Sequence, residues 1–350
     1  MLEIYPAYFE KFKCSASKCT CSCCANWEID IDPVSLKRYQ DYAGPLAARF
    51  KEKIFFKDDK AWFRVGDDNR CPFLNEQNLC DIYIEMGEEA LCETCTDHPR
   101  FFFEYDNFLI KGTGMACEEA AKLILDPDVD DRLVIKEVEK GSHEYVDANY
   151  SEMLNETDPK LEPNAEIKQD EMSSDHAESD ETQAILLKDE LIDFYEQAEA
   201  LSEYWLGSEE IINPDILSKY FDFLSSIEIN LPVWGETIVR IKKNLETILA
   251  KRIEFINTFP EVMEQYARMT RYFILRHYIK ADEYEDVDVG RDSELQIVML
   301  GLITVHLMNV DLWLQKGKFT IEDQVNCSKL FSREIEFSDK NTEALEDYIF

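Results

Sequence analysis

Residues 14–24 have the sequence CSASKCTCSCC, so five cysteines stand within eleven positions. The whole chain of 350 residues has eleven cysteines, and ten of them lie between Cys14 and Cys117. Thiols gathered this densely indicate a disulfide framework, a structural zinc site or a metal cluster. Each of these would hold the N-terminal part together through bonds to sulfur as well as through apolar burial.

Disulfides are the least favoured of these three explanations. The first residues, MLEIYPAYFEKFKC, contain neither an apolar core of signal-peptide length nor a small-residue cleavage site. The most apolar segment, residues 295–314, includes His306, Asn309 and Asp311 and therefore predicts a buried helix rather than a membrane span. We expect a cytoplasmic protein, in which thiols stay reduced. An odd number of cysteines would also leave one unpaired.

The formal charge of the chain is −36 at pH 7. Such a charge repels phosphate backbones and anionic lipid headgroups, so we expect neither nucleic acid nor a membrane as a partner. Solubility is the simplest explanation of the acidic excess. A partner that presents lysine side chains is the more specific alternative.

The composition divides the chain into three parts. Residues 1–140 contain nearly all the cysteines and mix short helices with short strands. Residues 141–184 are acidic and poor in large apolar residues, which predicts a disordered linker or loop. From 185 to 350, apolar residues recur at three- and four-residue spacing, which predicts an α-helical bundle-like domain. The expected fold class is α+β, mainly α, with a cysteine-rich metal-binding domain first.

Local signals predict several elements of the first part. Asp32 followed by Pro33 is typical of a helix N-terminus. Residues 100–114 predict a hairpin, and residues 115–126 predict a helix. Residues 61–65 and 71–80 are expected to form short strands around a turn.

The spacing of the later cysteines favours metal ligation. Cys71 and Cys80 flank the predicted turn, and Cys92 and Cys95 form a CxxC pair that can face one metal. Cys117 stands at the start of a predicted helix, where the helix dipole favours a thiolate. The spacing fits two zinc sites, or one iron–sulfur cluster with a second site or spare thiols, and does not separate zinc from iron.

Two familiar cofactor motifs are missing. A radical S-adenosylmethionine motif, CxxxCxxC, would require a third cysteine after Cys19 and Cys23, but that position is Asn26. No GxGxxG follows a predicted strand, so a Rossmann-type cofactor site is unsupported.

The sequence nevertheless resembles the flagellin lysine-N-methylase family. The segments that carry this resemblance are CSCCANW, CPFLNEQNLCDIYIEMG, CETCTDHPR, GMACEEAAKLIL and, near the C-terminus, LFSREIEFSDKN. The likeness is close over residues 1–126 and looser over the helical domain. Small cysteine-rich proteins that chelate zinc or iron share the CC and CPFL elements, so the first domain alone is less decisive.

The resemblance implies methylation of lysine side chains on flagellin, with S-adenosylmethionine as donor and a four-iron four-sulfur (4Fe-4S) cluster involved in the transfer. The cysteines that match the family pattern are Cys14, Cys19, Cys23, Cys24, Cys71, Cys80, Cys92, Cys95 and Cys117. Cys21 stands where the family usually has a polar residue, so we treat it as a bystander or an alternate ligand. Zinc remains the alternative metal.

Four further residues are candidates for the site. His98, Arg100 and Tyr83 are the catalytic candidates, and Trp27 and Arg100 are candidates for cofactor binding. Each also has a structural explanation: a hydrogen-bonded buried imidazole for His98, a surface ion pair for Arg100 and plain packing for Tyr83 and Trp27.

The C-terminal SREIE segment bears on the choice of function. Its residues Ser332, Arg333 and Glu336 would serve either a substrate site or a brace between the domains. The principal alternative to a methyltransferase is a non-catalytic zinc-binding protein with a helical interaction domain, and a match outside the metal-binding domain weighs against it. Radical chemistry of another kind is a third alternative, against which the missing motif weighs.

Overall fold

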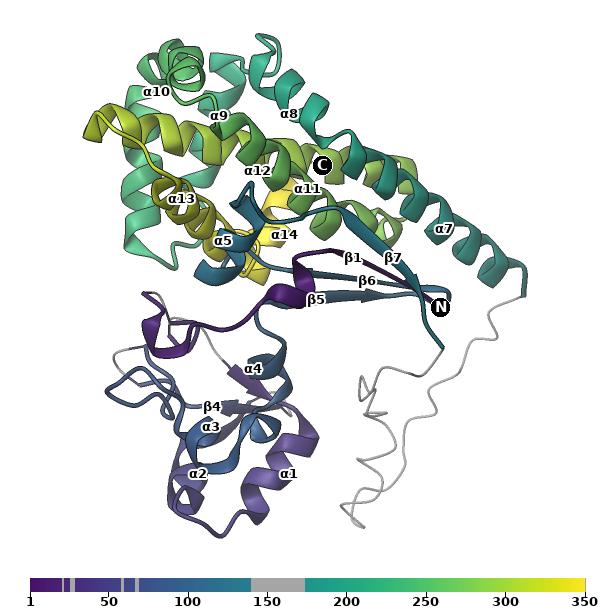
Figure 1. The fold of residues 1–350 in the computed structure, drawn as a ribbon, viewed down its shortest axis with the longest axis vertical. Coiled ribbons are helices and arrows are strands. Elements are labelled where there is room, and N and C mark those ends of the chain that lie inside the picture. Colours follow the sequence, from purple (N-terminus) through teal and green to yellow (C-terminus); the bar gives the residue numbers. More distant parts are fainter. Residues whose placement is uncertain (21, 26–28, 58–59, 67–68, 140–173, 350) are drawn as a thin grey trace.

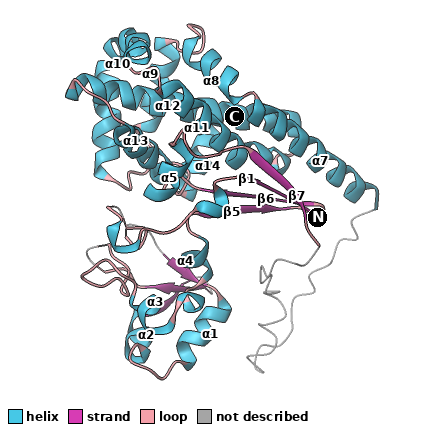
Figure 2. Ribbon diagram, viewed as in Figure 1, coloured by secondary structure: helices cyan, strands magenta, loops and turns pink. Residues whose placement is uncertain are grey.

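The computed structural model describes residues 1–20, 22–25, 29–57, 60–66, 69–139 and 174–349, with the backbone alone for 174–181. Figure 1 shows two bodies: a larger one of packed helices with a sheet along one side, and a smaller one below it. We call them the helical body and the cysteine body. Helices dominate the described chain (Figure 2), which confirms the expected class of a mainly helical α+β protein.

The sheet of the helical body has the strand order β5-β6-β1-β7. Its strands are β1 (Leu2–Pro6), β5 (Arg100–Glu104), β6 (Phe108–Thr113) and β7 (Leu133–Glu137). Strands β5 and β6 form the predicted hairpin, and β1 pairs in parallel with β6 and antiparallel with β7. Ile4, Phe108 and Ile110 of this sheet belong to the same hydrophobic core as the helices.

The helices of this body begin and end where local signals favour it. They are α5 (Glu118–Leu125), α7 (Ser174–Glu196), α8 (Ala198–Gly207), α9 (Pro214–Leu224), α10 (Pro232–Thr258), α11 (Val262–His277), α12 (Val287–Lys316), α13 (Ile321–Glu334) and α14 (Asp339–Ile349). Thr320 and Asp323 form a capping box at the start of α13. Gly317 ends α12 in the left-handed conformation at φ 68°, which a residue without Cβ adopts at little cost.

Helix α12 is long and apolar enough to cross a membrane by length and composition, but 78% of its most apolar window is buried in the protein. It packs against α10, α11 and α13. The segment 295–314 is therefore a buried core helix, as its sequence predicts.

The cysteine body is built on a three-stranded sheet with the order β2-β4-β3. Its elements are β2 (Ile29–Ile31), α1 (Pro33–Asp41), α2 (Ala47–Lys53), β3 (Ile54–Lys57), β4 (Lys60–Phe63), α3 (Asp81–Met86) and α4 (Glu93–Asp97), with short 3-10 turns at Ala16–Lys18 and Glu88–Ala90. Two further 3-10 turns, Phe9–Lys11 and Tyr278–Glu283, lie in the helical body. Its separate core contains the stacked rings of Tyr39 and Phe50, 4.5 Å apart, with Phe63 and Phe73 against them.

Several predictions for the first part are confirmed. The side chain of Asp32 accepts a hydrogen bond of 2.8 Å from the Ser35 N–H and so caps α1, which starts at Pro33. The helix expected over 115–126 is α5.

Two local predictions are wrong in part. The strand expected at 61–65 is confirmed by β4, but residues 71–80 form turns with one isolated bridge between Leu74 and Cys80, because the loop has too few extended residues for a ladder. The expected linker at 141–184 lies outside the described residues as far as 173, and from Ser174 onward it is the start of α7.

The division of the chain between the two cores does not follow the boundary near residue 140 that the sequence predicts. Strand β1 and residues 100–137 share the core of the helical body, whereas the core of the cysteine body lies within residues 29–92. The reason is the pairing of β1 with β6, a contact between residues about a hundred positions apart that no local pattern predicts.

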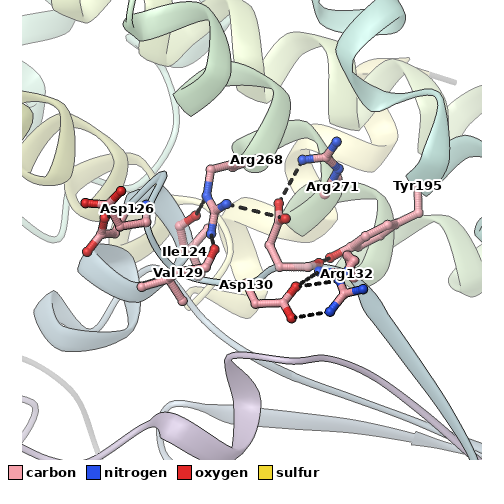
Figure 3. A network of polar contacts seen from close by, with 10 residues as sticks. Ile124, Asp126, Val129, Asp130, Arg132, Tyr195, Arg268 and Arg271 are labelled. Atoms are coloured by element: carbon pink, nitrogen blue, oxygen red, sulfur yellow. Dashed lines mark hydrogen bonds and ion pairs between the residues drawn. The ribbon is translucent and has the colours of Figure 1, made fainter.

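A buried arginine fixes the connection between α5 and β7 on helix α11 (Figure 3). The Arg268 guanidinium donates to the carbonyl oxygens of Ile124, at 2.7 Å, and Val129, at 2.8 Å. It also lies 3.4 Å from the carboxylate of Asp131, which Arg271 approaches to 2.8 Å. Through these contacts α11 holds the C-terminal end of α5, and the N-terminus of α5 carries Cys117.

Candidate functional site

Five of the predicted metal ligands lie at the core of the cysteine body. Two of them are buried members of that core and three pack against it; we call them the core group: Cys24, Cys71, Cys80, Cys92 and Cys95. The backbone N–H of Cys71 donates to the carbonyl of Cys24 at 2.8 Å, and that of Cys95 donates to Cys92 at 3.0 Å. Residues from three separate segments are thus brought together.

The other four lie where the cysteine loop meets the helical body; we call them the junction group: Cys14, Cys19, Cys23 and Cys117. Thr20 attaches the loop to α5, since both its backbone N–H, at 3.2 Å, and its hydroxyl donate to the Glu118 carboxylate. Cys117 precedes Glu118 as the N-cap residue of α5. The junction group therefore joins the first cysteine cluster to a residue about a hundred positions away.

Backbone N–H groups two or three positions after a cysteine are directed at its sulfur in both groups. They belong to Ala16 for Cys14 (3.3 Å), Phe73 for Cys71, Tyr83 and Ile82 for Cys80, and Ala120 and Glu119 for Cys117. A hydrogen bond from an N–H group stabilises a thiolate more than a thiol and orients the sulfur. The local backbone is therefore arranged for sulfur that carries negative charge.

The thiols differ in how readily they ionise. Burial raises the pKa of Cys71 to about 12 and that of Cys117 to about 11. The pKa of Cys24 is lowered to about 7 because its sulfur accepts hydrogen bonds from Cys23 and Ser22, helped by the charge of Arg70. A bound cation would remove the penalty on the buried thiolates.

The donor set fits a thiolate-bound metal in its chemistry. The cysteines that the structure describes are all free thiols, with ten in this state. Within the described part of the chain, no three Cys, His, Asp or Glu side chains already stand as a ready-made ligand set. Backbone contacts bring these segments together, but the described side chains are not arranged as a ligand set in this structure.

His98 lies in the junction between the two bodies. Its ring meets that of Phe337 edge to face, with centroids 5.7 Å apart. Burial, together with the charges of Arg333 and Arg276, lowers the pKa of His98 to about 4. The imidazole is therefore neutral at neutral pH and can accept a proton or a hydrogen bond.

The other predicted site residues are not gathered around His98. The Arg100 guanidinium packs over the Phe12 ring at 5.0 Å and donates to the carbonyl of Thr96 at 3.3 Å. The Tyr83 side chain is half exposed, and its backbone N–H donates to the thiol of Cys80. Trp27 and Cys21 lie outside the described residues.

Two basic residues of α13 reach the cysteine loop and its anchor. Arg333 donates to the carbonyl of Ala25 at 3.4 Å, and the Lys329 ammonium lies 4.0 Å from Glu118. Although burial opposes it, hydrogen bonds from Lys122 and Thr20 lower the pKa of Glu118 to about 2. The sequence analysis did not identify Glu118, Lys329 or Thr20 as residues of the site. The position of Glu118 directly after Cys117 is the signal that could have pointed to it.

The end of the SREIE segment is a brace. The Glu336 carboxylate is fully buried and accepts hydrogen bonds from the Tyr272 hydroxyl, at 2.8 Å, and His277 Nε2, at 2.9 Å. Arg276 lies 3.3 Å from the same carboxylate and packs over the Phe337 ring at 4.6 Å. Glu336 thus holds α11 against the residues that follow α13.

Residues 113–350 match the family model of the FliB lysine N-methylase C-terminal domain. The chain is 32% identical over 130 residues to proteins named Lysine-N-methylase from Salmonella choleraesuis (strain SC-B67) and Salmonella typhimurium (strain LT2), covering 35% of this chain and 32% of each relative. It is equally similar to the "Flagellar biosynthetic protein FliU" of Salmonella muenchen, of which the match covers 77%. The chain thus matches about a third of the length of the two lysine-N-methylases. No solved structure matches it.

Proposed function

Because the chain belongs to the FliB lysine N-methylase family, we propose that it methylates lysine side chains of a protein and that this protein is flagellin. The observation that carries the proposal is the family match over residues 113–350, which includes α5, α11 and α13. The flagellar name of one relative supports flagellin as the substrate. The reaction belongs in the cytoplasm, where thiols stay reduced.

S-adenosylmethionine is the proposed donor and a 4Fe-4S cluster the proposed metal group. When bound, the cluster supplies a redox-active iron site with Lewis-acid character. Cysteines of these groups would hold it, and the N–H of Ala16, which is directed at the sulfur of Cys14, supports that assignment. Arg100 and Trp27 remain predictions for donor binding.

Methyl transfer requires a neutral lysine amine. The amine nitrogen forms a bond to the methyl carbon, the bond from that carbon to the donor sulfur breaks, and its electron pair stays on sulfur. A group that accepts the proton of the lysine ammonium must act first. His98 is the proposed acceptor because its imidazole is neutral and packs against Phe337, but burial and the charges of Arg333 and Arg276, which lower its pKa to about 4, make it a weak base toward a lysine ammonium. The net charge of −36 would attract the cationic substrate.

The test is methylation of purified flagellin by the full chain. The protein is prepared without oxygen and incubated with flagellin and donor labelled in the methyl group, and methylated lysines are located by mass spectrometry. We expect label on lysine in the wild type and in Cys327→Ala, a control at a buried cysteine outside both groups. We expect its loss in Cys117→Ala.

A folded, iron-loaded wild type that leaves flagellin unlabelled contradicts the proposal. A colourless protein with stoichiometric zinc, no iron and no activity supports the alternative of a non-catalytic zinc-binding protein. His98→Gln sharpens the assignment: a base at this position predicts a lower kcat that recovers at higher pH, where more of the lysine is already neutral.

A further inference from the structure

The two cysteine groups lie in different surroundings, and we propose that they hold two different metal centres: a zinc ion in the core group and an iron–sulfur cluster in the junction group. The inference deepens the proposed function, because it says which cysteines serve the reaction and which serve the fold. It concerns metal content first, so it can be tested without methyl transfer.

The division runs between two consecutive residues. Cys24 packs against the core of the cysteine body, and its carbonyl accepts the N–H of Cys71. Cys23 lies outside that core, and Cys14 and Cys117 are near enough to act on it electrostatically. The thiols of Cys23 and Cys24 hydrogen-bond each other, so the groups adjoin at this pair. Each group contains at least the four thiols that one centre needs.

The core group suits a closed structural zinc site. Its thiols come as two neat pairs, Cys71 with Cys80 across a turn and Cys92 with Cys95 in a CxxC. Cys71 and Cys92 are buried, with Cys92 fully inaccessible. Two such pairs are the usual ligand pattern of structural zinc, which leaves no open coordination position. A core this small gains much of its stability from a metal.

The junction group suits a centre that meets a substrate. Cys14 is exposed, and Cys19, Cys23 and Cys117 are partly accessible. The group is attached to the domain that matches the family model through the bonds of Thr20 to Glu118. Four thiolates at irregular spacing are the usual ligands of an iron–sulfur cluster. Accessibility is what a cluster needs if a cofactor or substrate is to approach it.

Ligation requires the sulfurs of each group to turn toward one centre, because the described side chains do not yet form a ligand set. The thiols of Cys92 and Cys95 hydrogen-bond each other, as those of Cys23 and Cys24 do. Turning a cysteine side chain between staggered χ1 rotamers leaves the backbone unchanged, and the backbone already brings the segments together.

The first experiment measures zinc, iron and acid-labile sulfide per chain in the full protein purified without oxygen, together with its visible absorption. We expect about one zinc with about four irons and four sulfides. In Cys14→Ala/Cys19→Ala, iron and visible colour should fall at least tenfold while zinc stays at the wild-type level. Cys327→Ala should keep both.

The reciprocal variant is Cys80→Ala/Cys95→Ala, which should lose zinc and keep iron. The junction variant decides by itself, because neither Cys14 nor Cys19 belongs to a hydrophobic core and the protein should fold without them. Loss of zinc together with iron in Cys14→Ala/Cys19→Ala would overturn the proposal, as would a wild type that binds one metal centre. Both results are measured without flagellin. A failure of the methylation assay can therefore be told apart from a failure of the two-centre proposal.

Discussion

The helical body and the cysteine body reach stability by different means. In the helical body, α12 is enclosed by other helices and the core runs without interruption from the sheet to α14. Among its described residues, the cysteine body has a core of twelve buried ones, two of them cysteines, with three more cysteines packed beside it. A large apolar core stabilises itself, whereas a small one depends on cross-links or a metal. The difference predicts that the bodies respond to different perturbations.

Removal of metal should produce the largest difference in stability between the two bodies. We expect chelation under reducing conditions to unfold the cysteine body, because its core loses its thiolate cross-links, and to leave the helical body folded. Hydrogen exchange measures this: amides of β2 and β4 should lose protection by more than a hundredfold, while those of α11 and α12 stay protected. Equal protection of β2 and β4 before and after chelation would contradict the comparison.

The largest effect of a single substitution is expected within the helical body, at Arg268. Arg268→Ala leaves two carbonyl oxygens and the Asp131 carboxylate without their buried partner. We expect a loss of about 3–5 kcal/mol in the free energy of unfolding, measured by denaturant titration. Arg132→Ala removes an exposed arginine from the same region and should leave stability unchanged. An Arg268→Ala protein as stable as the Arg132 control would show that the network in Figure 3 contributes little.

The dependence of the free energy of unfolding on pH should also arise in the helical body. Burial raises the pKa of Glu294 to about 8, above the value of about 4.3 in an unfolded chain. The folded state therefore keeps this proton between those values, and the stability that the group contributes falls as pH rises from 5 to 8, by no more than about 1.4 kcal/mol per pH unit. Glu294→Gln, which cannot ionise, should flatten that slope. Thermal melts across this range measure it, and parallel slopes would contradict the assignment.

The smallest expected effect lies between the bodies. Thr20→Val removes the hydroxyl donor to Glu118 but keeps the backbone donor and the side-chain volume. We expect a loss of about 1 kcal/mol and faster release of iron to a chelator, because the junction group is less firmly attached. The matched control is Thr342→Val, which removes a hydroxyl bond to the carbonyl of Ile335 in the helical body. Iron release at the same rate in both variants would count against a role for Thr20.

How well the sequence predicted each feature depends on the range of the interaction behind it. The cap at Asp32, the hairpin of β5 and β6 and the buried helix α12 are produced by neighbours in sequence, and each was predicted. The strand expected at 71–80 was wrong, because a loop between two cysteines has the same composition whether or not it pairs. The contacts of Glu118 and of Arg333 were not predictable from their own segments.

By itself the sequence determined the cap of α1, the hairpin of β5 and β6, the buried helix α12 and the family resemblance, because caps, periodicity and motif spacing are local properties. The tertiary structure alone decided that β1 joins the helical body, that Glu336 is a buried brace and that Cys23 and Cys24 belong to different groups. The physical reason is that a sulfur's neighbours depend on how segments a hundred residues apart pack together. The positions of the cysteines in the sequence therefore do not show which of them become neighbours in the folded protein.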